Sequence, residues 1–412
     1  MAKQDDVHHG RGEDGESSLS LCSRCVTPVT AESLAFDSDG ACSVCKQIDY
    51  KRESIDWTER REQLDELINR YRGKYDHDCI VPFSGGKDST FTLWYIVKEL
   101  KLKPLVVRFN HGFFRPQLRE NCELAFRRLG VDVLEFTPNW QVVRKLMYES
   151  LVRRGDFCWH CHTGIFSYPM RVALQQQVPL VVWGEPTSEY SSFYSYDEEE
   201  LADERRFNRV VNLGINAEDM LGMMDDTISD YPVDLRDLKP FTYPPTSELR
   251  KARVSSVFLG YYIPWDVRKQ TEIIQDELDW KGDVVEGVPP GYEYEKIECY
   301  MQGVRDYIKY LKRGYGRTSH LVSIDIRNGR IDRDRGLELM QAYDGKRPPS
   351  LDLFLDILGI SEARFMEIVG RHVVDPHCMP DADSIESMDV KLDGMDDFRG
   401  VVCPDSPRAA SE

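Results

Sequence analysis

The chain has 412 residues, a net charge of -18 and an ordinary 41% of hydrophobic residues, which suits about two or three compact units. No apolar run reaches the ~20 residues that span a bilayer, and the polar first twenty residues contain no secretory signal, so we expect a cytoplasmic protein with no membrane partner. The acidic balance disfavours nucleic acid as a partner, because proteins that bind it carry a basic stripe, and favours a small-molecule acceptor.

The first fifty residues divide into two parts. Residues 1–20 are rich in Asp, Glu, Gly and Ser, which predicts a disordered tail. Residues 21–50 contain two Cys-x2-Cys turns, and facing turns of this kind hold zinc through four sulfur atoms. We therefore predict a zinc ribbon; a redox or catalytic role for the four is the alternative. The four cysteines are Cys22, Cys25, Cys42 and Cys45.

A helical linker is predicted for residues 51–75, and an α/β unit for residues 76–270. Apolar strand patterns alternate with helical ones, which is typical of a doubly wound parallel sheet. The predicted strands are 79–83, 104–109, 131–136, 179–183 and 258–262, and the helices between them are 90–100, 117–129, 140–153 and 165–177. Residues 271–375 are predicted to be helical, with helices at 304–312, 333–343, 350–358 and 361–372, and 376–412 to be an acidic mobile tail.

A phosphate-binding loop is predicted between the first strand and its helix. The loop reads Ser84-Gly85-Gly86-Lys87-Asp88-Ser89. Glycines allow the backbone to approach a polyanion, and the helix N-terminus adds positive charge. Lys87 supplies a full charge, the serines supply hydroxyl groups, and Asp88 indicates either bound Mg²⁺ or helix capping. The alternative is a glycine-rich turn without a ligand.

This hexapeptide resembles the PP-loop superfamily of N-type ATP pyrophosphatases, which have an adenine nucleotide α-hydrolase-like fold. The resemblance implies that ATP and Mg²⁺ bind, that ATP is cleaved between its α- and β-phosphates, and that AMP passes to a carbonyl or carboxylate oxygen. It also implies that residues at the ends of later strands border the nucleotide. These residues are Arg108, Phe109, Asn110, His111 and Gly184.

A second Cys-x2-Cys pair leaves three interpretations open. Cys158 and Cys161 flank His160, and His162 follows them. The segment is local packing, or the two thiols bind a metal or a [4Fe-4S] cluster with Cys299 as third ligand. In the third interpretation the loop lies in the active site, and a histidine accepts a proton from attacking ammonia.

Several further segments together resemble the N-acetyl sugar amidotransferases of bacterial surface-polysaccharide biosynthesis. The resemblance covers about residues 21–372. The segments that carry it are Cys-Ser-Arg-Cys-Val-Thr-Pro at 22–28, the loop at 84–89, Gly-Ile-Phe at 164–166, Trp-Gly-Glu-Pro-Thr-Ser-Glu-Tyr at 183–190, Leu-Gly-Tyr-Tyr at 259–262 and the stretch 307–317.

This resemblance implies an enzyme that adenylates the amide oxygen of an acetamido sugar nucleotide and replaces it with ammonia to give an amidine. Separate glutaminase and cyclase-like subunits would supply the ammonia. Glu185 and Glu189 follow the fourth strand and are expected to orient Mg²⁺ or the amine, or to be surface carboxylates.

A basic stretch is expected to bind the diphosphate of the sugar nucleotide, with Arg313 and Arg317 as substrate-binding residues, or else to form a solvated helix face. Its residues are Arg305, Lys309, Lys312, Arg313, Arg317, Arg327 and Arg330.

Two other functions remain as alternatives. The order of ribbon, loop, Cys-x2-Cys pair and distant third cysteine also resembles the tRNA 2-thiouridine synthetases, which implies sulfur transfer through an Fe–S cluster at Cys158, Cys161 and Cys299. The acceptor would then be a small molecule or a tRNA. The other alternative is an inactive ATP-binding scaffold, which the intact loop disfavours.

Overall fold

The architecture is built on five parallel strands. The structure, a computed structural model, describes residues 19–191, 193–199, 201 and 203–403. The strands form one sheet in the order β3-β2-β1-β4-β5. They are β1 Cys79–Pro82, β2 Pro104–Phe109, β3 Asp132–Phe136, β4 Leu180–Trp183 and β5 Ser255–Phe258. Because the chain leaves β1 toward β3 on one side and returns to β4 on the other, the strand order reverses at β1. The predicted doubly wound parallel sheet is confirmed.

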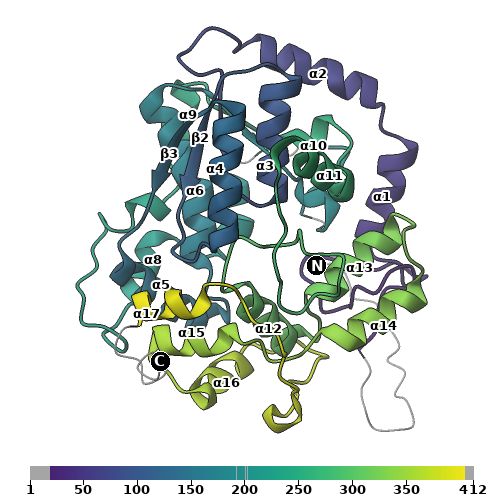
Figure 1. Ribbon diagram of the computed structural model, residues 1–412, viewed down its shortest axis with the longest axis vertical. Coiled ribbons are helices and arrows are strands. Elements are labelled where there is room, and N and C mark those ends of the chain that lie inside the picture. Colours follow the sequence, from purple (N-terminus) through teal and green to yellow (C-terminus); the bar gives the residue numbers. More distant parts are fainter. Residues whose placement is uncertain (1–18, 192, 200, 202, 404–412) are drawn as a thin grey trace, which may run out of the picture.

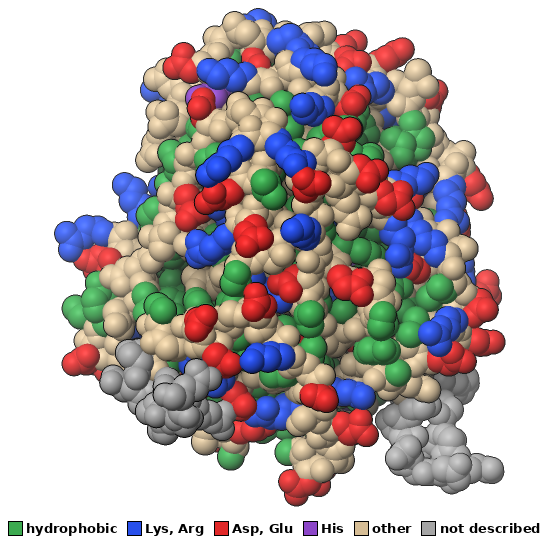
Figure 2. Space-filling view, viewed as in Figure 1, with side chains coloured by type: hydrophobic (Ala, Val, Ile, Leu, Met, Phe, Trp, Pro, Cys, Tyr) green, Lys and Arg blue, Asp and Glu red, His purple; other side chains and the backbone are tan. Residues whose placement is uncertain are grey.

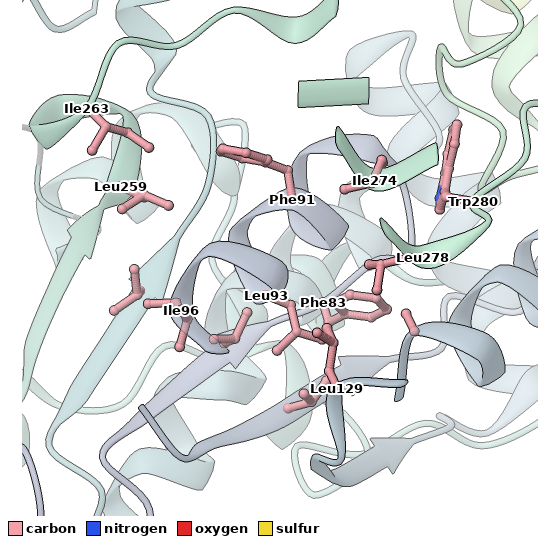
Figure 3. Close-up of a cluster of buried hydrophobic side chains, with 14 of the residues drawn as sticks. Phe83, Phe91, Leu93, Ile96, Leu129, Leu259, Ile263, Ile274, Leu278 and Trp280 are labelled. Atoms are coloured by element: carbon pink, nitrogen blue, oxygen red, sulfur yellow. The ribbon is translucent and has the colours of Figure 1, made fainter. Parts of the chain in front are cut away.

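Helices cover both faces of this sheet. Neighbouring strand residues point to opposite sides, so alternate side chains pack against the helices of one face or of the other. Cys79 and Val81 pack under α3, α4 and α11, in the cluster of apolar side chains drawn in Figure 3. Ile80 packs on the other face with residues of α6 and α9. The five helices are α3 Lys87–Trp94, α4 Pro116–Leu129, α6 Trp159–Gln176, α9 Thr246–Lys251 and α11 Val267–Leu278.

The remaining elements surround this core. The other α-helices are α1 Ser43–Glu53, α2 Trp57–Asn69, α5 Trp140–Arg154, α7 Glu204–Arg206, α8 Ala217–Met223, α10 Leu259–Tyr262, α12 Gln302–Arg313, α13 Arg317–Arg327, α14 Arg333–Tyr343, α15 Ser350–Leu358, α16 Glu362–Gly370 and α17 Met395–Val402. Short 3-10 and π segments lie at Tyr95–Glu99, Thr187–Glu189, Phe207–Val211, Lys239–Phe241 and Ala382–Ser384. None of the described helices is both long and apolar enough to cross a membrane.

The helical C-terminal region forms a second body beside the sheet. In Figure 1, α12, α15, α16 and α17 lie below the strands, and α13 and α14 lie beside the N-terminal segment. Apolar residues of α5 join this body, because Met147 and Leu151 share a buried cluster with Phe354 and Phe365. The predicted helical C-terminal region is confirmed, although α13 was not predicted. Its buried side chains are largely polar, among them Thr318 and Ser323, so it lacks an apolar stripe.

Two predictions at segment ends differ from the structure. The prediction of a strand at 258–262 is wrong except for Phe258: the strand lies at Ser255–Phe258, where it pairs with β4 up to Trp183. The turn of helix α10 follows, where Gly260 packs closely on Pro186.

The acidic tail expected over 376–412 is packed through residue 403. Leu392, Met395 and Cys403 are buried in the C-terminal cluster, and Tyr300 donates a hydrogen bond to the carbonyl oxygen of Asp393 at 2.6 Å. Apolar residues at helical spacing in α17 produce this packing despite the acidic composition. The rest of that tail, and the tail expected at 1–20 up to residue 18, lie outside the described residues.

Candidate functional site

The loop between β1 and α3 is shaped by its own hydroxyl groups. The Ser89 hydroxyl accepts hydrogen bonds from the backbone N–H groups of Ser84 at 3.2 Å and Gly85 at 3.1 Å. The Ser84 hydroxyl accepts one from the Gly86 N–H at 3.2 Å. Gly85 has a φ of +92°, which strongly favours glycine. The two serines therefore build the loop, and the first N–H groups of α3 remain for an anion.

Lys87 is buried at the start of α3 between two carboxylates. Its Nζ lies 2.9 Å from Asp88 Oδ2 and 2.7 Å from Glu295 Oε2. Burial opposes the charge of Lys87, but Asp88, Glu295 and Glu185 outweigh burial and hold its pKa well above the ordinary value. Glu295 is itself buried, yet Lys87, Lys296 and Arg317 lower its pKa to about 2. The loop lysine is therefore charged and held in place by a residue of the C-terminal region.

A small cavity of about 200 Å³ lies over this loop. Of the residues expected at the nucleotide, Phe109, His111 and Gly184 line it. Arg108 and Asn110 do not line it: Arg108 pairs with Glu135 at 2.8 Å, and the Asn110 amide donates to Thr137 Oγ1 at 3.0 Å. Ser84, Asp88, Ser89 and Glu185 contribute to its polar wall, together with Arg206, Lys296 and Glu298.

Two glycines allow the elements around this cavity to approach closely. A Cβ on Gly184 would lie 2.6 Å from Thr92 Oγ1 and 3.2 Å from the carbonyl oxygen of Asp88. A Cβ on Gly164 would fall well inside contact distance of the Phe109 ring. The end of β4 therefore lies against α3, and α6 lies against the end of β2.

A larger cavity of about 1120 Å³ adjoins the first. All seven basic residues of the predicted stretch line it, so they gather around a cavity. On the face shown in Figure 2, by contrast, Lys and Arg side chains are interspersed with Asp and Glu. The cavity is also lined by Lys87 and Glu185, and by ribbon residues 27–34. Three parts of the chain thus enclose it.

The two predicted substrate-binding arginines differ in their surroundings. Arg317 is buried and bidentate on Asp306, at 3.1 and 3.0 Å, and its NH1 lies 3.6 Å from Glu295. Arg313 pairs with Glu32 at 2.9 Å and donates to the carbonyl oxygen of Thr30 at 2.5 Å. Arg317 thus continues an ion-pair chain from Lys87 through Glu295, whereas Arg313 joins the ribbon to α12.

The two carboxylates after β4 also differ. Glu185 lines both cavities, and burial, together with the nearby Asp88, raises its pKa to about 8. Glu189 is buried, and its carboxylate is occupied by Lys51 and by the Tyr196 hydroxyl. Glu185 is therefore the one of these two that borders both cavities, whereas Glu189 lines only the larger one and its carboxylate is occupied by protein partners.

Of the segment from Cys158 to His162, only the last residue lines the larger cavity. His160 is 1% exposed and lines neither cavity, and burial lowers its pKa to about 4. Cys158, Cys161 and Cys299 pack in the same C-terminal cluster, and burial raises the pKa of the Cys161 thiol to about 12.

The four N-terminal cysteines form a preassembled metal site. Their sulfur atoms lie within 4.8 Å of one another, the one such group of three or more candidate ligands found in the described residues. The Sγ–Sγ distances are 3.9 Å for Cys22 and Cys45, 3.8 Å for Cys25 and Cys42 and 3.6 Å for Cys42 and Cys45. Zinc–sulfur bonds of about 2.3 Å in a tetrahedron place sulfur atoms about 3.8 Å apart, so the geometry fits zinc.

Functional residues between 271 and 304 were missed by the sequence analysis. Besides Glu295, they include Lys296, which lines both cavities, and Glu298, whose Oε1 lies 2.8 Å from where a Cβ of Gly86 would be. Trp280 donates to the carbonyl oxygen of Gly85 at 3.2 Å. The dense Glu-Tyr-Glu-Lys run at 293–296 was the available signal.

Comparisons with known proteins give three findings. Residues 292–378 match the family model described as "LPS biosynthesis protein WbpG-like, C-terminal domain". An uncharacterized protein of Methanocaldococcus jannaschii is 24% identical over 168 residues, 40% of this chain and 58% of the relative. The matched region thus spans less than two thirds of that relative.

The structure of the U34-tRNA thiolase NcsA from Methanococcus maripaludis with its [4Fe-4S] cluster aligns with 13% identity over 77% of this chain and 88% of that one. Its TM-score of 0.31 is too low to support an argument. The family-model match confirms, for residues 292–378, the resemblance to the sugar amidotransferases of surface-polysaccharide biosynthesis.

Proposed function

Starting from the match of residues 292–378 to a WbpG-like domain, we propose that the protein is an ATP-dependent amidotransferase acting on an acetamido sugar nucleotide. The amide oxygen attacks the α-phosphorus of ATP, and the bond to the β-phosphate breaks with its electron pair leaving on pyrophosphate. Ammonia then adds to the activated carbon, a proton is released, and AMP departs with the former amide oxygen. The product is an amidine.

One observation carries this proposal: the matched region and the phosphate loop line the same cavity. Lys87 comes from α3 and Arg317 from α13, and both line the larger cavity while Glu295 lies between them. A cavity that holds both reactants in contact converts a bimolecular reaction into an effectively unimolecular one.

ATP is assigned to the smaller cavity with its phosphates directed toward the phosphate loop, where the two cavities adjoin. The N–H groups at the start of α3 and the ammonium of Lys87, which lines the larger cavity, suit the pyrophosphate. The Phe109 ring in the smaller cavity offers an apolar surface for the adenine. Asp88 and Glu185 would hold Mg²⁺, since this ion prefers carboxylates and phosphate oxygens. Bound Mg²⁺ would neutralise charge on the phosphates.

The sugar nucleotide is assigned to the larger cavity. Its basic wall suits a diphosphate, and Arg313 lies where the ribbon meets α12. The zinc assigned to the four ribbon cysteines would hold in place the segment that closes this cavity. Ammonia would come from separate glutaminase and cyclase-like subunits, in the cytoplasm.

The test is mass spectrometry of products formed from a panel of UDP-acetamido sugars with ATP, Mg²⁺ and ammonium. We expect a product in which NH has replaced O, with one AMP and one pyrophosphate per turnover. Lys87→Ala and Ser84→Ala should abolish this product, because they remove the loop's charge and a hydroxyl group that shapes it. Unchanged ATP cleavage in both variants would show that the loop is not the site.

Sulfur transfer is the second candidate, because Cys158, Cys161 and Cys299 belong to one apolar cluster, although among the described residues only the four N-terminal cysteines have their sulfur atoms gathered as metal ligands. The same panel with a sulfide donor would then give a heavier product in which S replaces O. Metal analysis of protein purified without oxygen distinguishes the two functions. Amidine formation predicts zinc alone, whereas sulfur transfer predicts iron and acid-labile sulfide in addition.

A further inference from the structure

The place where the two cavities meet identifies a residue for the group-transfer step. Five residues line both cavities, and in the proposed reaction the adenylyl group passes from one cavity to the other. The reacting atoms must therefore meet beside them. The five are Phe166, Glu185, Tyr190, Arg206 and Lys296.

Lys296 differs from Lys87, the lysine of the phosphate loop, in the carboxylates that lie near its ammonium group. Lys87 has carboxylate oxygens at 2.9 and 2.7 Å. Within the described ranges of the chain, no carboxylate lies within the 4.0 Å ion-pair distance of Lys296 Nζ. The charge of Lys296 still acts on the site. It opposes the rise that burial causes in the pKa of Glu185, and it helps to lower the pKa of Glu295. Lys296 thus brings a positive charge to the junction without a direct ion pair among the described residues.

The backbone places this charge at an energetic cost. Lys296 has a φ of +53°, in the left-handed region that is unfavourable for a residue other than glycine. The preceding Glu295 is held on one side by Lys87 and on the other by Arg317. This anchoring fixes the chain where Lys296 turns, so the side chain emerges at the junction. Backbone strain of this kind occurs preferentially at functional sites.

We propose that Lys296 contacts the phosphoryl oxygens of the adenylyl group and stabilises the charge on it as the acceptor oxygen bonds to the α-phosphorus and the bond to pyrophosphate breaks. This inference rests on the proposed function. Lys296 forms no covalent bond, and the electron pair leaves on pyrophosphate. A positive charge already in place where charge shifts in the transition state lowers the barrier.

The test compares three variants. Lys296→Asn removes the charge but tolerates the left-handed backbone, because asparagine adopts positive φ more readily than most residues. Lys296→Arg restores a charge of the same sign. The control is Lys101→Asn, the same substitution at an exposed lysine that also has a φ of +53° and lines neither cavity.

We expect Lys296→Asn to lower the acceptor-dependent rate of pyrophosphate release about 10²–10³-fold, as for loss of one stabilising group in other enzymes. Equilibrium binding of Mg·ATP should change much less, Lys296→Arg should recover part of the rate, and Lys101→Asn should match the wild type. A Lys296→Asn rate within about threefold of wild type would overturn the proposal.

A second measurement does not need turnover. An amine-modifying reagent, read out by peptide mass spectrometry, should label Lys296 in the free protein and label it less with Mg²⁺ and α,β-methylene-ATP. Lys101 should be labelled equally in both. Equal labelling of Lys296 with and without nucleotide overturns the inference. If the wild type releases no pyrophosphate with any acceptor, the proposed function fails, and the labelling alone decides the role of Lys296.

Discussion

At the scale of single residues, the candidate site is organised by which charges are neutralised within the protein. Lys87 and Arg317 share Glu295, while Glu185 and Lys296 lie at the junction of the two cavities. Buried charges are retained where they are paired. The paired groups therefore fix the geometry, and the groups at the junction are those that a ligand can change.

Glu185→Gln should change how stability depends on pH. The folded-state pKa of Glu185, about 8, lies above the ordinary value of 4.5, so the folded protein holds this proton more tightly than the unfolded chain. The contribution is present below pH 4.5 and is lost as pH rises through 8. The variant removes this loss, and its urea midpoint should fall less than that of wild type between pH 5 and 9.

The matched control for this measurement is Glu272→Gln, at an exposed position of α11. Its midpoint should follow that of the wild type at every pH. Parallel curves for Glu185→Gln and wild type would mean that the Glu185 carboxyl ionises as freely in the folded protein as in water.

The positions of the loop and of the four-cysteine cluster could be predicted from sequence because each is encoded in a short pattern. Glu295 could not, since its role depends on partners at positions 87 and 317, far away in the chain. The same reason explains Glu189: Lys51, which occupies its carboxylate, belongs to a segment more than 130 residues earlier. The charged run at 293–296 marks the segment, but nothing in the local sequence identifies the distant partners of a paired charge.

At the scale of elements, close packing of helices on strand ends forms the smaller cavity. Helix α6 crosses the end of β2 at Gly164, directly against Phe109. The Phe109 ring cannot withdraw freely, because Phe136 and Phe241 have ring centroids 5.8 Å away on other sides. Sequence periodicity predicted these elements, but it could not show that β5 stops where β4 stops, since register is a property of the pair.

Gly164→Ala should destabilise the protein by about 1–3 kcal/mol, as expected for overpacking a buried contact. It should also push Phe109 toward the smaller cavity and weaken nucleotide binding. Gly222→Ala is the control: Gly222 is exposed in α8 with nothing within 4 Å of where its Cβ would lie, and alanine there should stabilise by up to about 1 kcal/mol. Denaturant unfolding measures both, and equal stability of Gly164→Ala and wild type would contradict the packing argument.

At the scale of the whole molecule, the larger cavity exists because three parts of the chain converge. Arg333 of α14 donates to the carbonyl oxygens of Cys25 at 3.2 Å and Cys22 at 3.3 Å, and Thr27 bonds Ser323 of α13 at 3.1 Å. The ribbon is thus fixed on the C-terminal region, which in turn reaches the loop through Glu295. The ribbon, the loop and most of the C-terminal helices were predicted from sequence, but helix α13, Glu295 and the convergence of the three parts were not.

Substitution of Glu295 is the most direct test of the connection between the loop and the C-terminal region. Glu295→Gln preserves the shape of the side chain but leaves Lys87 and Arg317 without their shared carboxylate. Leaving a buried charge with no partner costs about 3–5 kcal/mol. Because Lys87 keeps Asp88 and Arg317 keeps Asp306, we expect a smaller but measurable loss of stability in urea unfolding at pH 7. The pKa of Glu295 is lowered to about 2, so its contribution is complete above pH 4.5. The difference from wild type should therefore shrink as pH falls from 4.5 toward 2.

Glu293→Gln, two residues earlier and exposed, provides the comparison and should leave stability nearly unchanged. In the Glu295→Gln variant, binding at one cavity should no longer affect affinity at the other, because Glu295 is the group that Lys87 and Arg317 share. In wild type, a sugar nucleotide in the larger cavity should alter the affinity for Mg·ATP; in the variant, titrations with and without it should coincide. If the variant kept both full stability and the coupling, Glu295 would be a neighbour of the loop and of α13 without connecting them.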